Sequence, residues 1–67
     1  MEISARNQLK GTIQHIRTDG VMAEVVIDLG GQEVVSTITR ASAERLKLAR
    51  GDAVVAVIKA SDVIIGK

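Results

Sequence analysis

Hydrogen-bond donors gather at three separated places in the chain. Ser4 and Arg6 alternate along one expected strand, so their side chains share a face. Thr39 and Ser42 bracket the expected start of a helix, where free backbone N–H groups and the helix dipole favour an anion. The run Lys59-Ala60-Ser61 ends another expected strand with a cation, a hydroxyl and loop N–H groups. Each group has an ordinary structural role, but together they would suit a ligand that only accepts hydrogen bonds.

The chain lacks the groupings that enzymes use. It has one histidine and no cysteine, and it shows no paired carboxylates, no catalytic triad and no phosphate-cradling glycine loop. His15 is expected to be a surface or interface residue. Four aspartates stand at or beside expected turns, where their carboxylates bind local backbone N–H groups: Asp19, Asp28, Asp52 and Asp62. The sequence therefore predicts a protein that is not an enzyme and supplies no side chain as a direct metal ligand.

Length and composition predict a single domain over residues 1–67 that is too small to be stable as a monomer. A domain this small buries only about 60% of its unfolded surface, and this one has no Phe, Tyr or Trp to enlarge its core. Disulfides and zinc are excluded because cysteine is missing. Oligomerisation is the remaining way to stabilise such a scaffold, so a homo-oligomer is expected.

The same composition argues against several partners. No apolar stretch approaches the roughly 18 residues of a membrane span, and the first residues have no signal-peptide core, so a cytoplasmic protein with no membrane association is expected. The net charge is +1 and aromatic residues are absent. Nucleic-acid binding, which uses basic surfaces and aromatic stacking, is therefore not expected.

The elements that must position the donors are mostly strands. Apolar runs predict strands at about 3–16, 21–29, 32–39, 53–59 and 63–65, with a helix over about 40–48 that Thr39 caps. Gly11 suggests a bulge or a sharp bend, and Gly30-Gly31 a two-residue hairpin turn. Ala43, Leu46 and Leu48 are the helix residues offered to a core. This order fits an all-β chain with one short helix, a five-stranded OB-like barrel; an SH3-like barrel is the alternative.

In the second strand the residues alternate, so one face should be buried. Its apolar members are Ala23, Val25, Ile27 and Leu29.

The chain resembles the molbindin (Mop) family of small molybdate- and tungstate-binding proteins. The resemblance rests on the runs 4–11, 39–42 and 59–61 and on the Ile64-Ile65-Gly66 ending, and it spans essentially the whole chain. It implies an OB-like barrel of the Mop/TOBE type, assembled as a hexamer that is a trimer of dimers. It also implies that oxyanions are held at subunit interfaces, with molybdate or tungstate as the bound ligand.

The resemblance implies a binding set drawn from two subunits. One subunit would supply two segments and its neighbour two hydroxyls: Ser4, Ala5, Arg6, Lys59, Ala60 and Ser61, with Thr39 and Ser42 from the neighbour. The family also has a second kind of site near the threefold axis, for which His15 and the Gly20-Val21 turn are candidates.

The expected function is intracellular storage and homeostasis of molybdate or tungstate. The main alternative is an accessory or regulatory oxyanion-sensing subunit that acts through a partner protein. The other, an OB-type nucleic-acid-binding domain, is disfavoured by the missing aromatic residues and the low net charge.

Overall fold

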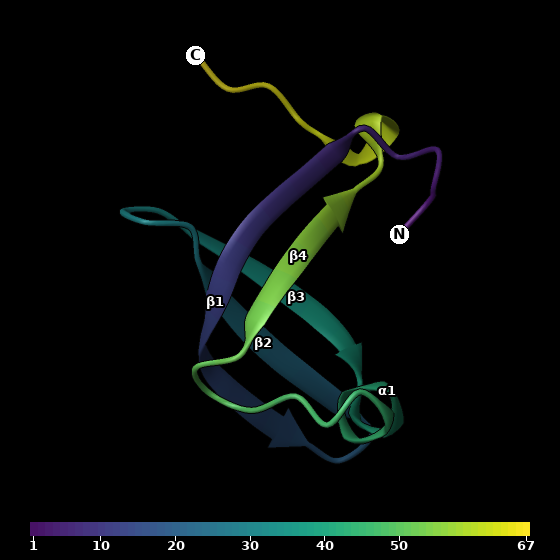
Figure 1. Cartoon of the computed structure of the whole chain (residues 1–67), viewed down its shortest axis with the longest axis vertical. Helices are drawn as coiled ribbons and strands as arrows, with labels where there is room; N and C mark the ends of the chain where they lie inside the picture. The colour runs from purple at the N-terminus through teal and green to yellow at the C-terminus, as the bar shows by residue number, and fades with distance from the viewer.

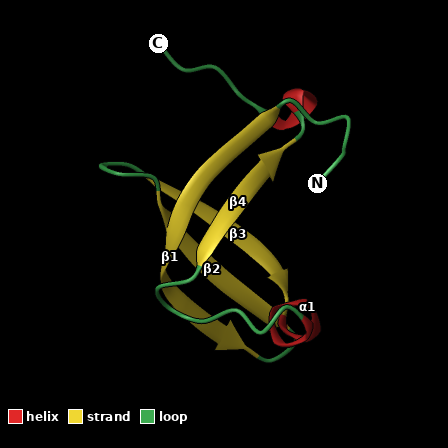
Figure 2. Ribbon diagram, viewed as in Figure 1, coloured by secondary structure: helices red, strands yellow, loops and turns green.

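One curled antiparallel sheet forms most of the molecule. The computed structural model describes all 67 residues. Its strands are β1 (Asn7–Asp19), β2 (Met22–Asp28), β3 (Glu33–Thr39) and β4 (Ala53–Ile58), with the helix α1 (Arg40–Arg45) between β3 and β4 and a 3-10 helix, η1 (Ala60–Asp62), after β4. The order across the sheet is β3-β2-β1-β4, so β3 and β4 are its edges (Figures 1 and 2).

The long strand β1 curls the sheet by pairing with two different neighbours. Its first half pairs with β4, from Asn7 opposite Ile58 to Thr12 opposite Ala53. Its second half pairs with β2, from Thr12 opposite Asp28 to Asp19 opposite Met22. The two pairings therefore meet at Thr12, and β1 bends along its length (Figure 1).

Gly11 allows the close approach that this arrangement needs. A Cβ atom at Gly11 would lie 2.6 Å from the Ile27 Cγ2 atom and 2.7 Å from the Asp28 carbonyl oxygen. The predicted bulge is not at this residue, because Gly11 pairs in register with Val54 and the register shift of β1 lies between Ile13 and His15. Glycine stands at this position because a backbone carbonyl leaves no room for a side chain.

We expect Gly11→Ala to lower the free energy of unfolding by about 1–3 kcal/mol, the usual cost of forcing extra volume into a packed site. The carbonyl of Asp28 belongs to a paired strand and cannot move aside without distorting the sheet. Urea unfolding followed by circular dichroism measures the change. Gly66→Ala is the matched control, since nothing lies within 4 Å of a Cβ there. Equal stability of the two variants would contradict the packing argument.

The core is small and confirms the predicted face of β2. Only 6 of 67 residues are buried, and Ile13, Val25, Ile27 and Ala56 form its central cluster. Ala23 is also buried, and Leu29 packs at the margin, as the alternation predicted. A core of this size, without aromatic side chains, leaves the single chain poorly stabilised.

The hairpin turn and the helix start are where the sequence placed them. Gly30 and Gly31 have φ values of 88° and 117°, and the Leu29 N–H donates to the Gln32 carbonyl across 2.8 Å. Thr39 caps α1, which ends at Arg45 rather than near residue 48.

Of the three helix residues offered to the core, two reach it and one does not. Ala43 is buried and Leu48 packs against the central cluster. The prediction for Leu46 was wrong, because the early helix end leaves its side chain 60% exposed.

The predicted fifth strand is not formed, and the sheet stays an open half-barrel. After β4 the chain turns through η1, away from the sheet edges, and residues 63–67 extend from the molecule without pairing (Figure 1). Val63, Ile64 and Ile65 are 48%, 92% and 85% exposed. The first strand likewise begins at Asn7 and not near residue 3. The predicted five-stranded OB-like barrel is therefore corrected to a four-stranded open sheet within one chain.

The open side of the half-barrel is an apolar groove between the edge strands β3 and β4. The groove has a volume of about 400 Å³, and 13 of its 14 lining residues are hydrophobic. Val35, Val55 and Val57 stand exposed along it, together with Leu46 from the end of α1. An unpaired edge beside an apolar surface is a surface on which another strand can pair.

The only helices are short, and none is long and apolar enough to cross a membrane.

Candidate functional site

The pairing of β1 with β4 brings two of the three donor groups together. Asn7 opposite Ile58 is the last pair of that ladder. Arg6 and Lys59 directly flank the pair, one entering β1 and the other leaving β4. Adjacent strands lie about 5 Å apart, so the segments 4–6 and 59–61 are neighbours at one end of the molecule (Figure 1). Strand pairing thus brings Arg6 and Lys59 together although more than fifty residues separate them in the sequence.

The cations of this end are not neutralised within the chain. The chain has two ion pairs, Arg17 with Glu24 and Arg40 with Glu44, and neither involves Arg6 or Lys59. Lys59 stands at the N-cap of η1 and makes no side-chain capping bond. Asp62, the acidic residue of η1, donates its backbone N–H to the Lys59 carbonyl at 2.9 Å and forms no ion pair. Two positive charges therefore remain free for an anion.

Gln8, which was not predicted as a site residue, supports this end. Its Nε2 atom donates to the Ala5 carbonyl oxygen at 2.9 Å. This bond ties the segment before β1 to the strand and occupies an acceptor that would otherwise repel an anion. The spacing of three residues between Ala5 and an amide side chain was the available signal.

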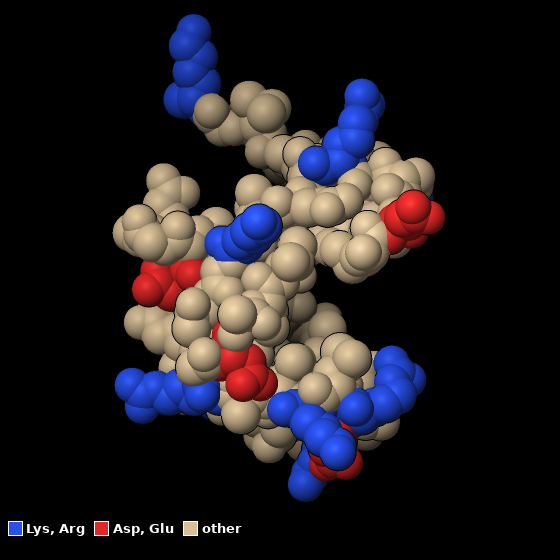
Figure 3. All heavy atoms as spheres, viewed as in Figure 1, with Lys and Arg blue, Asp and Glu red and all other residues tan.

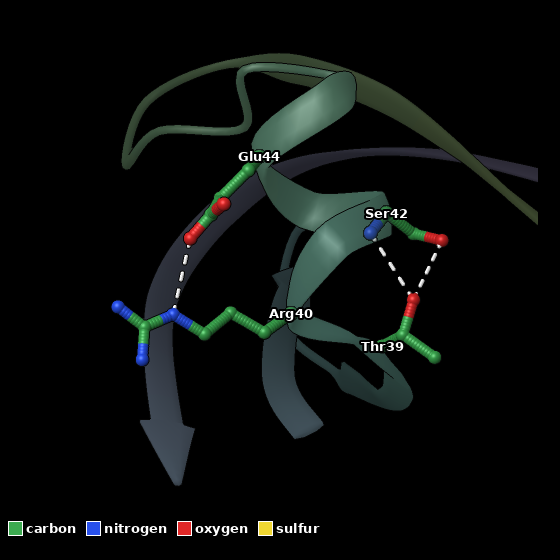
Figure 4. Close-up of polar contacts among 4 residues, drawn as sticks. All are labelled: Thr39, Arg40, Ser42 and Glu44. Carbon is green, nitrogen blue, oxygen red and sulfur yellow. Dashed lines mark hydrogen bonds and ion pairs between the residues drawn. The ribbon is translucent and has the colours of Figure 1, made fainter. Parts of the chain in front are cut away.

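The third donor group, at the start of α1, has one hydroxyl proton to spare. The Ser42 N–H donates to Thr39 Oγ1 at 3.1 Å, and Thr39 Oγ1 donates to Ser42 Oγ at 2.8 Å (Figure 4). Two hydroxyls share one proton in such a contact, so the Ser42 O–H stays available to an outside acceptor. The Arg40 Nε atom donates to Glu44 Oε1 at 3.0 Å, which partly neutralises the neighbouring cation.

The second-site candidates are separated by the structure. Gly20 and Val21 line a hollow of about 430 Å³ together with Thr39 and Arg40, and the Arg40 N–H donates to the Val21 carbonyl at 2.7 Å. His15 lies elsewhere, exposed in the middle of β1 opposite Val26. The Gly20-Val21 turn therefore lies beside Thr39 at the start of α1, whereas His15 lies near neither the α1 donors nor the segments 4–6 and 59–61.

Within one chain the two donor ends do not meet. The segments 4–6 and 59–61 lie at the η1 end, whereas Thr39 and Ser42 lie at the α1 end of a molecule 33 Å long (Figure 1). Each end offers hydroxyls, cations or N–H groups. Each end also carries a carboxylate: that of Asp62 in η1, which forms no ion pair, and that of Glu44 in α1, which is paired with Arg40. One chain thus carries two separate groups of donors, one at each end. No group of three His, Cys, Asp or Glu side chains is arranged to hold a metal ion.

Two of the predicted aspartate roles, those of Asp28 and Asp52, are confirmed. Asp28 Oδ1 accepts the Gly30 N–H at 2.8 Å, and Asp52 Oδ2 accepts the Ala49 N–H at 2.9 Å. These carboxylates stabilise turns and are not free for chemistry.

Comparisons with known proteins give a consistent result over the whole chain. A family model described as the TOBE domain matches residues 3–65. A probable molybdenum-pterin-binding protein from Haemophilus influenzae is 46% identical over 67 residues, covering 98% of this chain and 97% of that protein.

Two solved structures share the fold and differ in how much of them this chain covers. A molybdate-binding protein from Sporomusa ovata superposes with a TM-score of 0.95 at 42% identity, and each chain is covered completely. ModG, a cytoplasmic molybdate-binding protein solved with molybdate bound, gives a TM-score of 0.89 at 45% identity. That match covers 96% of this chain and 46% of ModG. The four-stranded half-barrel is therefore the form this fold takes in a molybdate-binding protein of the same length.

Proposed function

This chain belongs to the TOBE-domain family, among its molybdenum-pterin-binding (Mop) proteins, and on that premise we propose that it binds molybdate or tungstate between subunits. The family is one of binding proteins and not of enzymes. We assign this protein to storage and buffering of the oxyanion in the cytoplasm, the compartment in which ModG is described.

The observation that carries this proposal is the division of the donors between opposite ends of one chain. Ser4, Ala5 and Arg6 with Lys59, Ala60 and Ser61 form one half of the site, and Thr39 with Ser42 forms the other. A neighbour that places its α1 end against the η1 end completes the set. In a two-fold dimer each contact is made twice, so one such pair of chains holds two oxyanions.

The chemistry of these groups suits a proton-free dianion. Molybdate and tungstate are fully deprotonated at neutral pH, so their oxygens only accept hydrogen bonds. Phosphate near pH 7 still carries a proton, and a pocket of donors leaves that proton without an acceptor. An unmet buried hydrogen bond costs about 1–3 kcal/mol, a discrimination of roughly tenfold to a hundredfold. Sulfate is also proton-free but smaller, so the size of the cavity must exclude it.

The open groove supports assembly of several copies. The sheet leaves two edges unpaired, and the chain ends in an exposed apolar segment, Val63–Ile65, that has the composition of a strand but no partner. The segment of one copy would cover the groove of another and supply the missing strand. We propose a hexamer built as a trimer of dimers, in which this exchange forms the contact within each dimer.

Native mass spectrometry with and without added molybdate tests the proposal, because it reports the number of chains and of bound oxyanions together. We expect six chains, with molybdate bound only to the oligomer. A monomer that holds molybdate equally well would contradict the shared site.

Saturating molybdate is also expected to raise the melting temperature by roughly 10–20 °C. Arg6 and Lys59 repel each other in the empty site, and the dianion removes that repulsion. At a free concentration about a hundred times the Kd, ligand binding stabilises the folded state by about 2.7 kcal/mol. Each kcal/mol shifts the midpoint of a domain this size by about 4–8 °C. Differential scanning calorimetry measures the shift, with phosphate as the control anion; no shift with molybdate would contradict the proposal.

A further inference from the structure

Positive charge is concentrated in and just after α1. Residues 40–50 contain four basic side chains and one acidic one, a net charge of +3, whereas the rest of the chain sums to −2. The basic residues are Arg40, Arg45, Lys47 and Arg50. Figure 3 shows a cluster of basic side chains at this end of the molecule. A nearly neutral protein is thus strongly polarised.

Three of these cations have no acidic partner. Only Arg40 forms an ion pair, with Glu44, so Arg45, Lys47 and Arg50 remain unpaired and exposed. The nearest downstream carboxylate, that of Asp52, is occupied by the Ala49 N–H at 2.9 Å. No ion pair therefore neutralises these three cations, although the nearby carboxylates of Glu44 and Asp52 offset part of their field.

Arg45 and Lys47 stand close to the hydroxyl half of the proposed site. Arg45 follows Ser42 by three residues in α1, which places both on one face of the helix. The Leu46 N–H donates to the Ser42 carbonyl at 3.0 Å and the Lys47 N–H to the Glu44 carbonyl at 3.0 Å, so the chain remains wound against the helix. Arg45 lies one helical turn from Ser42, and Lys47 follows the Leu46 C-cap directly, so both cations lie on the order of 10 Å from Ser42.

We propose that Arg45 and Lys47 steer the oxyanion toward the site and do not bind it. This inference rests on the proposed function. An incoming dianion is attracted by each of these charges, and over about 10 Å that attraction is strong at low ionic strength and nearly abolished at high ionic strength. Steering of this kind accelerates association and leaves dissociation unchanged.

The experiment compares the double variant Arg45→Gln/Lys47→Gln with Lys10→Gln/Lys67→Gln, which removes the same charge from exposed positions outside α1. Because the protein has no Trp or Tyr, association is followed by rapid filtration with radiolabelled molybdate, and dissociation by a chase with unlabelled molybdate. At about 10 mM ionic strength we expect the association rate constant of the first variant to fall roughly five- to tenfold. We expect the control variant to slow association by a smaller factor, about twofold, because its charges lie farther from Ser42, and the difference between the variants to vanish near 1 M salt.

Three other outcomes would contradict these proposals. Equal association rates for the two variants would overturn steering. Faster dissociation of molybdate from Arg45→Gln/Lys47→Gln, with association unchanged, would also overturn it, because the residues would then be ligands. Absence of any molybdate binding by the wild type would overturn the proposed function itself.

Discussion

Replacing Arg6 and Lys59 together by alanine is expected to weaken molybdate binding by at least a hundredfold and to leave the fold intact. The two side chains flank the last pair of the β1–β4 ladder and are the only charges of the segments 4–6 and 59–61. Hydrogen bonds to charged groups contribute about 1.5–3 kcal/mol each, which corresponds to roughly tenfold to more than a hundredfold per residue. Equilibrium dialysis with radiolabelled molybdate measures the affinity.

The expected loss is specific to binding because neither side chain supports the sheet. Arg6 and Lys59 are both exposed and form no ion pair. Lys10→Ala is the matched control, since it removes an exposed cation from β1 and lies outside both segments. Unchanged affinity in Arg6→Ala/Lys59→Ala would remove both residues from the site.

Local patterns predicted the parts of the fold that depend on neighbouring residues. The alternation along β2, the positive φ values of Gly30 and Gly31 and the Thr39 cap all follow from short-range chemistry, and all are confirmed. The early end of α1 was missed because the helix-forming residues continue beyond Arg45, whereas the chain adopts a left-handed conformation at Lys47, with φ of 53°.

The sequence patterns could not predict features that depend on pairing between distant parts of the chain. Apolar composition predicted a strand at Val63–Ile65, but a strand also needs an edge within reach, and η1 turns this segment away from the edges of its own sheet. The bend of β1 was expected at Gly11, but its cause, the close approach of the Asp28 carbonyl, depends on pairing across the sheet.

The same limit applies to the site. The residue types in the segments 4–6 and 59–61 indicated an anion, and β-sheet topology then joined them, a step that spacing alone could not supply. Thr39 and Ser42 bond to each other as a capping pair, but their distance from the other donors appears only in the folded chain.

Deleting residues 63–67 is expected to dissociate the oligomer. The deletion removes three exposed apolar side chains that contribute nothing to pairing within the chain. Burying a side chain of this kind contributes about 1.5–3 kcal/mol, so three of them in the groove of a partner account for a large part of a stable contact. Sedimentation velocity measures the change. Deletion of Gly66 and Lys67 alone is the control, and it is expected to leave the oligomer intact.

This deletion also separates a shared site from a site within one chain, because every residue of the proposed binding set is retained. If neighbouring chains build the site together, the dissociated variant binds molybdate far more weakly although its ligands are unchanged. If one chain sufficed, the variant would keep its affinity as a monomer. An oligomer that survives the deletion would show instead that the groove is covered by another segment, and the exchange of Val63–Ile65 would then be wrong.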